Sequence, residues 1–136
     1  MSKSILVVED NAANAELLRD WLEMEGYRPF LAASLSAATG LLCELPPDAV
    51  LLDIQLGPDN GLNLLPWMRQ RAELRDIPVI AVTAQATVGD RQQILESGCD
   101  ALISKPIDFR QLREQLHLHL NPMRAARGAS SPAGRR

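Results

Sequence analysis

Short apolar segments alternate with segments of helical periodicity five times along the chain, and this alternation is the feature that most restricts its fold. Residues 5–8, 49–52 and 79–82 are continuous apolar runs, which are typical of strands buried on both faces of a parallel sheet. Two more strands are expected over residues 27–32 and 100–104. Because Pro29 cannot donate a backbone hydrogen bond, the strand over residues 27–32 is expected at an edge of the sheet.

The segments between the strands carry apolar residues at helical spacing. Helices are expected over residues 12–25, from about residue 36 to Pro46, after Gly61, over residues 87–97 and over residues 109–120. The helix over residues 87–97 has few apolar residues. Strands and helices that alternate in this way form a parallel sheet with right-handed crossovers. We therefore predict an α/β fold, a flavodoxin-like (βα)5 doubly wound parallel sheet with strand order 2-1-3-4-5.

The charge is distributed unevenly along the chain. Residues 1–120 contain 10 Lys and Arg residues against 17 Asp and Glu residues, a net charge of −7, whereas residues 121–136 contain four Arg and no acid. An acidic folded region argues against direct binding of nucleic acid, which requires a basic surface. We predict a single domain over residues 1–122 and a disordered basic tail over residues 123–136, whose composition cannot form a core.

Hydropathy and cysteine content bear on the cellular compartment. No segment approaches the ~20 apolar residues that span a bilayer, and the apolar run over residues 5–8 is too short for a secretory signal. The two cysteines, Cys43 and Cys99, are too few for a disulfide framework, and we expect both to be buried in a reducing environment. The sequence predicts a cytoplasmic protein that makes no membrane contact.

Polar and charged residues stand at the ends of four predicted strands. Glu9 and Asp10 come after the first strand, Asp53 ends the third, Thr83 ends the fourth and Lys105 follows the fifth. In the predicted order these strands are neighbours, and ligands of such sheets bind beyond the carboxyl ends of the strands. We therefore expect these five side chains to converge on one site.

The residue types at these strand ends fit phosphoryl chemistry. Three carboxylates in one shallow site repel one another and raise each other's pKa values. Mg²⁺ removes this conflict, because it binds a few carboxylates together with water and phosphate oxygens. One carboxylate can then attack a phosphoryl donor and form an acyl phosphate. A lysine ammonium and a hydroxyl can contact the remaining phosphoryl oxygens.

Each of these residues also has a purely structural interpretation. Asp10 or Thr83 could cap the helix that follows it, and Lys105 could be an ordinary surface lysine. Asp53 is harder to explain in this way, because it ends a continuous apolar run. Five such residues at four neighbouring strand ends favour a functional site.

Four motifs carry a resemblance to a known family: ILVVEDN at 5–11, LLDIQL at 51–56 with Gly61 downstream, VIAVTA at 79–84 and SKP at 104–106. Over residues 3–120 the sequence resembles the response-regulator receiver family of two-component signalling. Within that family it looks closest to the single-domain receivers of cell-cycle and stress phosphorelays. The resemblance implies a cytoplasmic phosphoprotein that switches on phosphorylation.

The resemblance also implies roles for individual residues. Asp53 would be the phosphoacceptor and a Mg²⁺ ligand, together with Asp10, the backbone carbonyl of Gln55 and Glu9, which would act mainly through metal-bound water. Thr83, Ala84, Leu102 and Lys105 would form the region that contacts the phosphoryl group and switches. The peptide bond between Lys105 and Pro106 would be cis, which is affordable before proline.

Two positions depart from the pattern of the family. Four residues after the phosphoacceptor the family usually has proline, whereas this chain has Gly57 followed by Pro58, which should change the shape of the loop. Three residues before the lysine the family usually has an aromatic residue that turns inward on phosphorylation, and here Leu102 stands. We therefore expect the response in the loop and helix over residues 84–97, with little change at Leu102.

The partners follow from the resemblance as well. A phosphohistidine on a histidine kinase or a histidine phosphotransfer protein would donate the phosphoryl group. The face made by the fourth helix, the fifth strand and the fifth helix would bind a downstream protein target. The chain would assist its own phosphorylation and dephosphorylation, and it would not turn over an external substrate as an enzyme.

Three alternatives remain open from the sequence. A phosphatase of the haloacid-dehalogenase type also uses an aspartate and Mg²⁺, but it requires a second aspartate at position 55, where Gln55 stands, and a cap domain. A receiver-like module could bind its partner without phosphorylation. The chain could also be the receiver fragment of a longer regulator, with its tail as a linker.

Overall fold

The computed structural model describes residues 2–84 and 87–120. The predicted basic tail over residues 123–136 and the predicted domain boundary at residue 122 lie outside the described residues.

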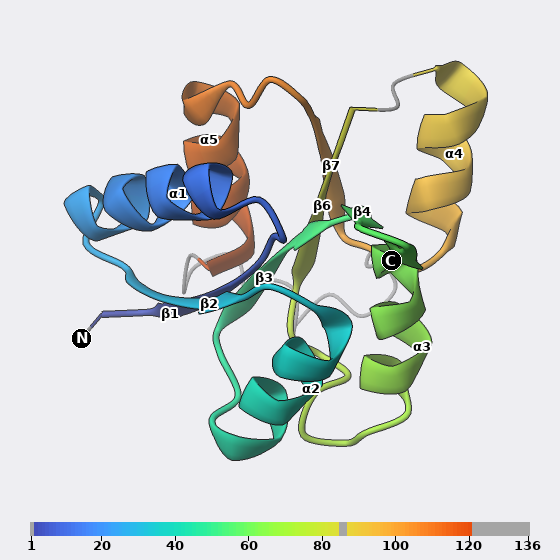
Figure 1. Ribbon diagram of the computed structural model, residues 1–136, viewed down its shortest axis with the longest axis horizontal. Coiled ribbons are helices and arrows are strands. Elements are labelled where there is room, and N and C mark those ends of the chain that lie inside the picture. The colour runs from blue at the N-terminus through green and yellow to red at the C-terminus, as the bar shows by residue number, and fades with distance from the viewer. Residues whose placement is uncertain (1, 85–86, 121–136) are drawn as a thin grey trace.

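A parallel sheet forms the centre of the molecule (Figure 1). Its strands are β1 (Ser4–Val8), β2 (Arg28–Ala32), β3 (Ala49–Asp53), β6 (Val79–Thr83) and β7 (Ala101–Ser104). They lie in the order β2-β1-β3-β6-β7, which confirms the predicted order 2-1-3-4-5 of the five main strands. β2 lies at the edge, where Pro29 pairs with Ile5 of β1, so the strand that contains proline has the position predicted for it.

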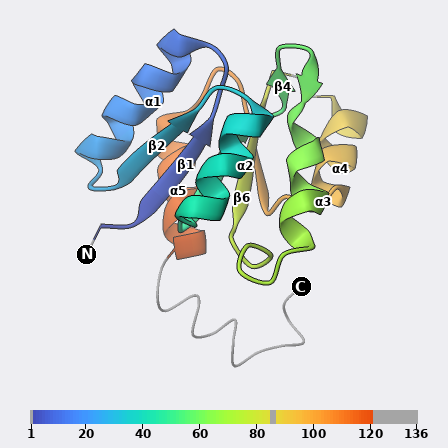
Figure 2. The same cartoon turned by 60° about the horizontal axis from the view of Figure 1, so that its bottom comes forward.

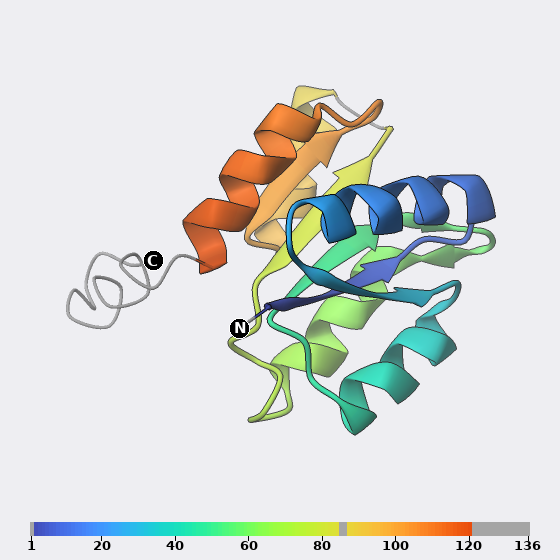
Figure 3. The ribbon, with the colours of Figure 1, turned by 90° about the vertical axis from the view of Figure 1, so that its left-hand side faces the viewer.

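Within the described residues, four α-helices connect the strands, α1 (Ala12–Met24), α2 (Leu35–Glu44), α3 (Leu64–Arg69) and α4 (Val88–Glu96), and α5 (Phe109–Leu120) follows β7. A short 3-10 helix, η1 (Gly61–Asn63), precedes α3. Asn11, Ser34 and Thr87 cap α1, α2 and α4, because each side chain accepts a hydrogen bond from the backbone N–H three residues later. α1 and α5 cover one face of the sheet, and α2, α3 and α4 cover the other (Figures 1 and 3).

The alternation of side chains along each strand divides the core into two layers. Ile5 and Val7 of β1 pack in the layer beneath α1 and α5. Leu6 and Val8 pack in the layer beneath α2, α3 and α4. All four are at most 2% exposed, as expected for a strand covered by helices on both faces. None of the helices in the described ranges is long and apolar enough to cross a membrane.

A small hairpin after β3 is an element that the sequence did not predict. β4 (Gln55–Leu56) and β5 (Asp59–Asn60) pair antiparallel and project beyond the end of the sheet (Figure 2). Gly57 has a φ of +58° and is the first residue of the two-residue turn, a position at which glycine is favoured. Proline at position 57 could not adopt this angle, so this turn requires a residue other than the proline that is usual in the family.

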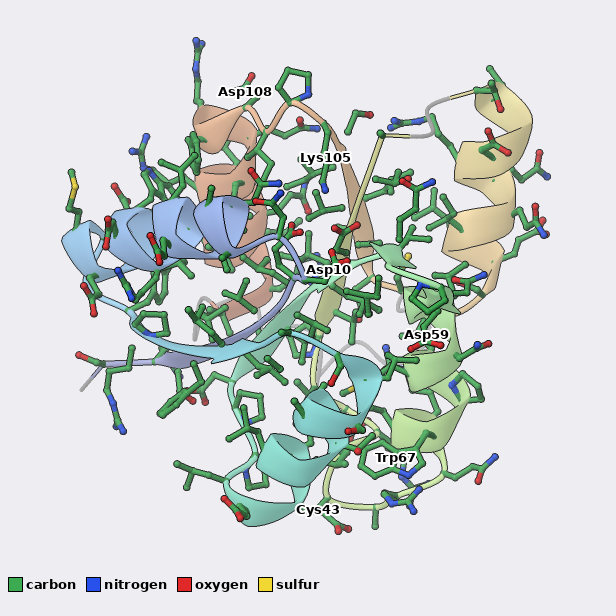
Figure 4. The ribbon with its side chains drawn as sticks, viewed as in Figure 1. Asp10, Cys43, Asp59, Trp67, Lys105 and Asp108 are labelled. Atoms are coloured by element: carbon green, nitrogen blue, oxygen red, sulfur yellow. The ribbon has the colours of Figure 1, made fainter. Side chains whose placement is uncertain are left out.

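One smaller expectation was wrong. Cys43 is exposed, whereas Cys99 is buried as predicted; Cys43 lies near the end of α2, and Figure 4 shows it at the side of the molecule opposite Lys105. In α4 the apolar residues Val88 and Leu95 are 83% and 45% exposed. Ile94 is therefore the residue that α4 buries in the core.

Candidate functional site

The residues predicted to converge lie at the carboxyl ends of four neighbouring strands. Glu9 and Asp10 follow β1, Asp53 is the last residue of β3, Thr83 is the last of β6 and Lys105 follows β7. Figure 4 shows Asp10 and Lys105 at this end of the sheet. In a parallel sheet the carboxyl ends of the strands all lie at the same end of the sheet. Glu9 and Lys105, which are 96 positions apart in the chain, therefore lie close together.

Glu9, Asp10 and Asp53 form an acidic cluster. Each offers a carboxylate oxygen, and these oxygens lie within 4.8 Å of one another. Glu9 and Asp53 are buried, at 5% and 4% exposure, whereas Asp10 is exposed. Burial raises the pKa of Glu9, and the nearby charge of Asp53 adds to this effect. The cluster therefore has the character of a site that a positive charge would stabilise.

Lys105 supplies one positive charge to the cluster. Its Nζ lies 2.9 Å from Asp53 Oδ2 and 3.6 Å from Glu9 Oε1. Burial alone would lower the pKa of Lys105, but the hydrogen bond with Asp53 and the charges of Asp53 and Glu9 outweigh it and raise the pKa. Lys105 is thus held as an ammonium against the two buried carboxylates, and it is not the freely solvated lysine of the structural alternative.

The backbone fixes the two buried carboxylates. Asp53 Oδ1 accepts a hydrogen bond from the N–H of Gln55 at 3.1 Å, and Glu9 Oε2 accepts one from the N–H of Asn11 at 3.1 Å. Asn11 also caps α1, because its side chain accepts the N–H of Asn14. Asp10 therefore does not cap this helix, and its carboxylate stays exposed at the cluster.

Thr83 does not cap α4 either, since Thr87 does. Thr83 is fully buried at 0% exposure and is the cross-strand neighbour of Ser104. Its carbonyl oxygen accepts the N–H of Lys105 at 2.8 Å, which ties the ends of β6 and β7 together. Ala84, the next residue, is exposed.

The remaining predicted positions lie around this centre. The peptide bond between Lys105 and Pro106 is cis, as expected. Gln55 begins β4 with an exposed side chain, and its N–H is the donor that contacts Asp53. Leu102 is 7% exposed and packs in the core layer beneath α2, α3 and α4.

Gly61 is a residue of the site whose role the sequence analysis missed. A Cβ at position 61 would overlap the carbonyl oxygen of Asp53 and lie 3.1 Å from the Asp53 carbonyl carbon. The N–H of Gly61 donates to the carbonyl oxygen of Ile54 at 2.6 Å. The hairpin can fold back onto the end of β3 because Gly61 has no side chain. The motif that contains Gly61 was visible in the sequence, but this long-range approach was not.

The arrangement is suited to binding a hard cation and a phosphoryl group. Carboxylate oxygens are the ligands that Mg²⁺ takes in proteins, and an ammonium is a partner for anionic oxygens. A carboxylate that lies beside both can act as a nucleophile.

Comparison with known proteins agrees with this geometry. The sequence model of the response regulator receiver domain matches residues 5–117. The polar-differentiation response regulator DivK of Brucella ovis is 44% identical over 120 residues, which cover 88% of this chain and 98% of that protein.

Solved structures resemble the fold over the same region. The receiver domain of the sensor histidine kinase PA1611 from Pseudomonas aeruginosa PAO1, which has a magnesium ion coordinated in its active-site cleft, superimposes with a TM-score of 0.80 at 31% identity, covering 88% of this chain and 98% of that chain. The receiver domain of a signal transduction histidine kinase from Syntrophus aciditrophicus gives the same TM-score, 0.80, at 31% identity, covering 88% and 90%. The chain belongs to the response regulator receiver domain family of two-component signalling.

Proposed function

We propose that this chain is a response regulator that accepts a phosphoryl group on Asp53 from a phosphohistidine. The observation that carries the proposal is the environment of Asp53: a buried carboxylate at a strand end, 2.9 Å from the Lys105 ammonium and within 4.8 Å of two other carboxylates. A carboxylate in such a position has a partner for the negative charge that a phosphoryl group brings.

The reaction needs little chemistry from the protein beyond positioning. A carboxylate oxygen of Asp53 attacks phosphorus, the bond from phosphorus to the histidine nitrogen breaks, and its electron pair leaves on the imidazole. The product is an acyl phosphate. Lys105 holds the acceptor carboxylate before the reaction and contacts a phosphoryl oxygen after it, and the Thr83 hydroxyl contacts another.

The acidic cluster fits Mg²⁺. Its donor set consists of carboxylates, one exposed and two buried, and we propose that Asp10, Asp53 and the Gln55 carbonyl bind the ion directly while Glu9 acts mainly through water. Mg²⁺ bound there would offset the negative charge of the carboxylates and of the phosphoryl oxygens.

The output is proposed to be a protein contact. α4 carries exposed apolar side chains at Val88 and Leu95, and α5 carries one at Leu118, which are 83%, 45% and 47% exposed. We propose that a histidine kinase or histidine phosphotransfer protein supplies the phosphoryl group and that the face formed by α4, β7 and α5 binds a downstream protein. In this scheme the chain acts in the cytoplasm as a single-domain regulator of the DivK kind, and it does not act as an enzyme on external substrates.

The proposal is tested by incubating the protein with acetyl phosphate and Mg²⁺ and measuring its intact mass. We expect the mass of one phosphoryl group on the wild-type chain and none on Asp53→Asn, which is nearly isosteric. Asp59→Asn is the matched control, because Asp59 is an exposed acid in the neighbouring hairpin, and it should be labelled like the wild type. Equal labelling of Asp53→Asn would show that another residue is the acceptor, and no labelling of the wild type would favour a module that binds without phosphorylation.

A further inference from the structure

α4 is joined to the sheet by a polar contact next to the proposed acceptor site. Nη1 of Arg91, in the first turn of α4, donates a hydrogen bond to Oγ of Ser104 at 3.0 Å. Ser104 is the last residue of β7 and immediately precedes Lys105. Within residues 2–84 and 87–120, no other side chain of α4 is hydrogen-bonded to the sheet, and Arg91 forms no ion pair.

The serine at the other end of this hydrogen bond is tied to the site through the backbone. Ser104 is the cross-strand neighbour of Thr83, and the N–H of Lys105 donates to the Thr83 carbonyl oxygen at 2.8 Å. The Nζ of Lys105 contacts Asp53 Oδ2 at 2.9 Å. Arg91 therefore bonds to the residue that pairs with Thr83 and immediately precedes Lys105, the two residues that are proposed to contact the phosphoryl group.

α4 has few other attachments to the body of the domain. Ile94 is its buried residue, whereas Val88 at its start is 83% exposed. An element with so few buried apolar contacts opens or shifts at a small free-energy cost. The hydrogen bond from Arg91 is consequently a large part of what holds the first turn of α4 in place.

Leu102 lies on the same face of β7 as Ser104, because side chains two positions apart along a strand share a face. Leu102 packs in the core layer on the α4 side of the sheet, and its apolar side chain cannot form a hydrogen bond. On this face of β7, the Arg91–Ser104 contact is thus the polar link between α4 and the end of the strand.

We propose that the Arg91–Ser104 hydrogen bond is a latch that holds α4 in its unphosphorylated position and that breaks when Asp53 is phosphorylated. This inference rests on the proposed function. When the Thr83 side chain moves toward the phosphoryl group, α4, whose N-cap Thr87 stands four residues after Thr83 in the chain, shifts as well, and Arg91 leaves Ser104. Arg91 is a positioning residue in this scheme, because it acts through α4 and does not contact the phosphoryl group.

The latch makes a reciprocal prediction. If occupation of the acceptor site must break the hydrogen bond, then removal of the hydrogen bond favours occupation of the site. Arg91→Ala and Ser104→Ala should each bind beryllofluoride, a phosphoryl mimic, more tightly in the presence of Mg²⁺. The net contribution of one hydrogen bond corresponds to an affinity gain of about two- to ten-fold. The double variant should gain no more than either single variant, since the same bond is lost in all three.

Calorimetric titration of the full chain with beryllofluoride and Mg²⁺ measures these affinities, and amide hydrogen exchange of α4 in the free protein gives a second readout. Gln92→Ala is the matched control, because Gln92 is the next residue of α4 and, among the described residues, its side chain is hydrogen-bonded to Glu96 of the same helix. It should leave both the affinity and the exchange of the first turn unchanged. Ser104→Thr keeps a hydroxyl and should restore the wild-type affinity, and Arg91→Ala should speed exchange in the first turn of α4.

The outcomes separate this inference from the function on which it rests. Lack of a phosphoryl label on wild-type Asp53 would overturn the proposed function and the coupling with it. Labelling of every variant at Asp53, with beryllofluoride affinities equal to that of the wild type, would overturn the latch alone. Weaker binding by Arg91→Ala, with Gln92→Ala unchanged, would also overturn it, because Arg91 would then stabilise the occupied state.

Discussion

Asp53 shows how the properties of one side chain come from neighbours that are distant in the sequence. It ends the apolar strand β3, where an isolated charge would be costly. Lys105 lies 2.9 Å away and offsets that charge, and the N–H of Gln55 holds the other carboxylate oxygen. Burial and the charge of Asp53 raise the pKa of Glu9. With all three carboxylates of the cluster ionised, their negative charge exceeds the single positive charge of Lys105.

Gly61→Ala is expected to damage the site through packing alone. The added Cβ would overlap the Asp53 carbonyl oxygen, so either β3 or the hairpin must move. We predict a decrease in the free energy of unfolding of about 1–3 kcal/mol or more, together with slower phosphorylation of Asp53. Chemical denaturation and labelling with acetyl phosphate would measure the two effects.

The control for this variant is the same substitution at a different glycine, one that has open space around it. Gly40 lies within α2 and a Cβ there would meet nothing within 4 Å, so Gly40→Ala should stabilise the protein by about 0.5–1 kcal/mol through helix propensity. A Gly61→Ala protein with wild-type stability and labelling would contradict the role that we assign to the close approach.

At the scale of elements, one arginine joins three segments near the amino ends of β6 and β7, at the end of the sheet opposite the site. Nη1 of Arg69, at the end of α3, donates to the carbonyl oxygens of Arg75 and Ile77. Its Nη2 donates to the Gly98 carbonyl and to Asp100 Oδ2. The guanidinium therefore fixes the loops that lead into β6 and β7, the two strands that carry Thr83 and Lys105.

Arg69→Met should lower the free energy of unfolding by about 2–3 kcal/mol, because the carbonyl groups lose charge-assisted hydrogen bonds. Arg19→Met serves as the comparison, since Arg19 pairs with the adjacent Asp20 on an exposed part of α1, and it should change stability by less than about 0.5 kcal/mol. Urea denaturation would measure both. Equal effects of the two substitutions would show that the Arg69 contacts add nothing beyond a surface charge.

The elements that the sequence predicted well are those set by periodicity. The three central strands are continuous apolar runs, and Pro29 was enough to assign β2 to the edge, because each of these features acts locally. The β4–β5 hairpin was missed because strands of two residues are too short to show a repeating pattern of apolar and polar side chains. Its turn depends on the φ of Gly57, which a sequence does not display.

The sequence also predicted part of the candidate site. The sequence located the five strand-end residues, because topology alone brings parallel strand ends together. It left open whether Asp10 was a helix cap, and the structure gives that role to Asn11. The approach of Gly61 to Asp53 and the bond from Arg91 to Ser104 depend on how loops and helices pack, and no local pattern reports such packing.

For the whole molecule, the acidic cluster should link stability to Mg²⁺. An ion that binds the folded chain stabilises it by mass action, by about 2.7 kcal/mol at 100 times its Kd. We predict that millimolar Mg²⁺ raises the Tm of the wild type by several degrees and raises that of Asp53→Asn by less. Asp59→Asn, in the exposed hairpin, should respond like the wild type. Differential scanning calorimetry with and without Mg²⁺ would show this, and equal shifts for the wild type and Asp53→Asn would place the ion elsewhere.

The same stabilisation should depend on pH. Metal ligands bind in their deprotonated form, and the pKa of Glu9 is raised by burial. The increase in Tm should therefore be complete above the raised pKa of Glu9, should begin to decrease as the pH falls through it, and should be lost once the carboxyl groups of the cluster are protonated. An Mg²⁺ effect that persists at a pH where carboxyl groups are protonated would contradict a carboxylate site.

The central claim is that Asp53 carries the phosphoryl group as an acyl phosphate, and chemical trapping tests it most directly. Borohydride reduces an acyl phosphate to an alcohol with release of phosphate, which converts a phosphorylated aspartate to homoserine. After treatment with acetyl phosphate, Mg²⁺ and borohydride, peptide sequencing by mass spectrometry should find homoserine at position 53. Homoserine at Asp10 instead, or a reduced side chain at Glu9, would contradict the account.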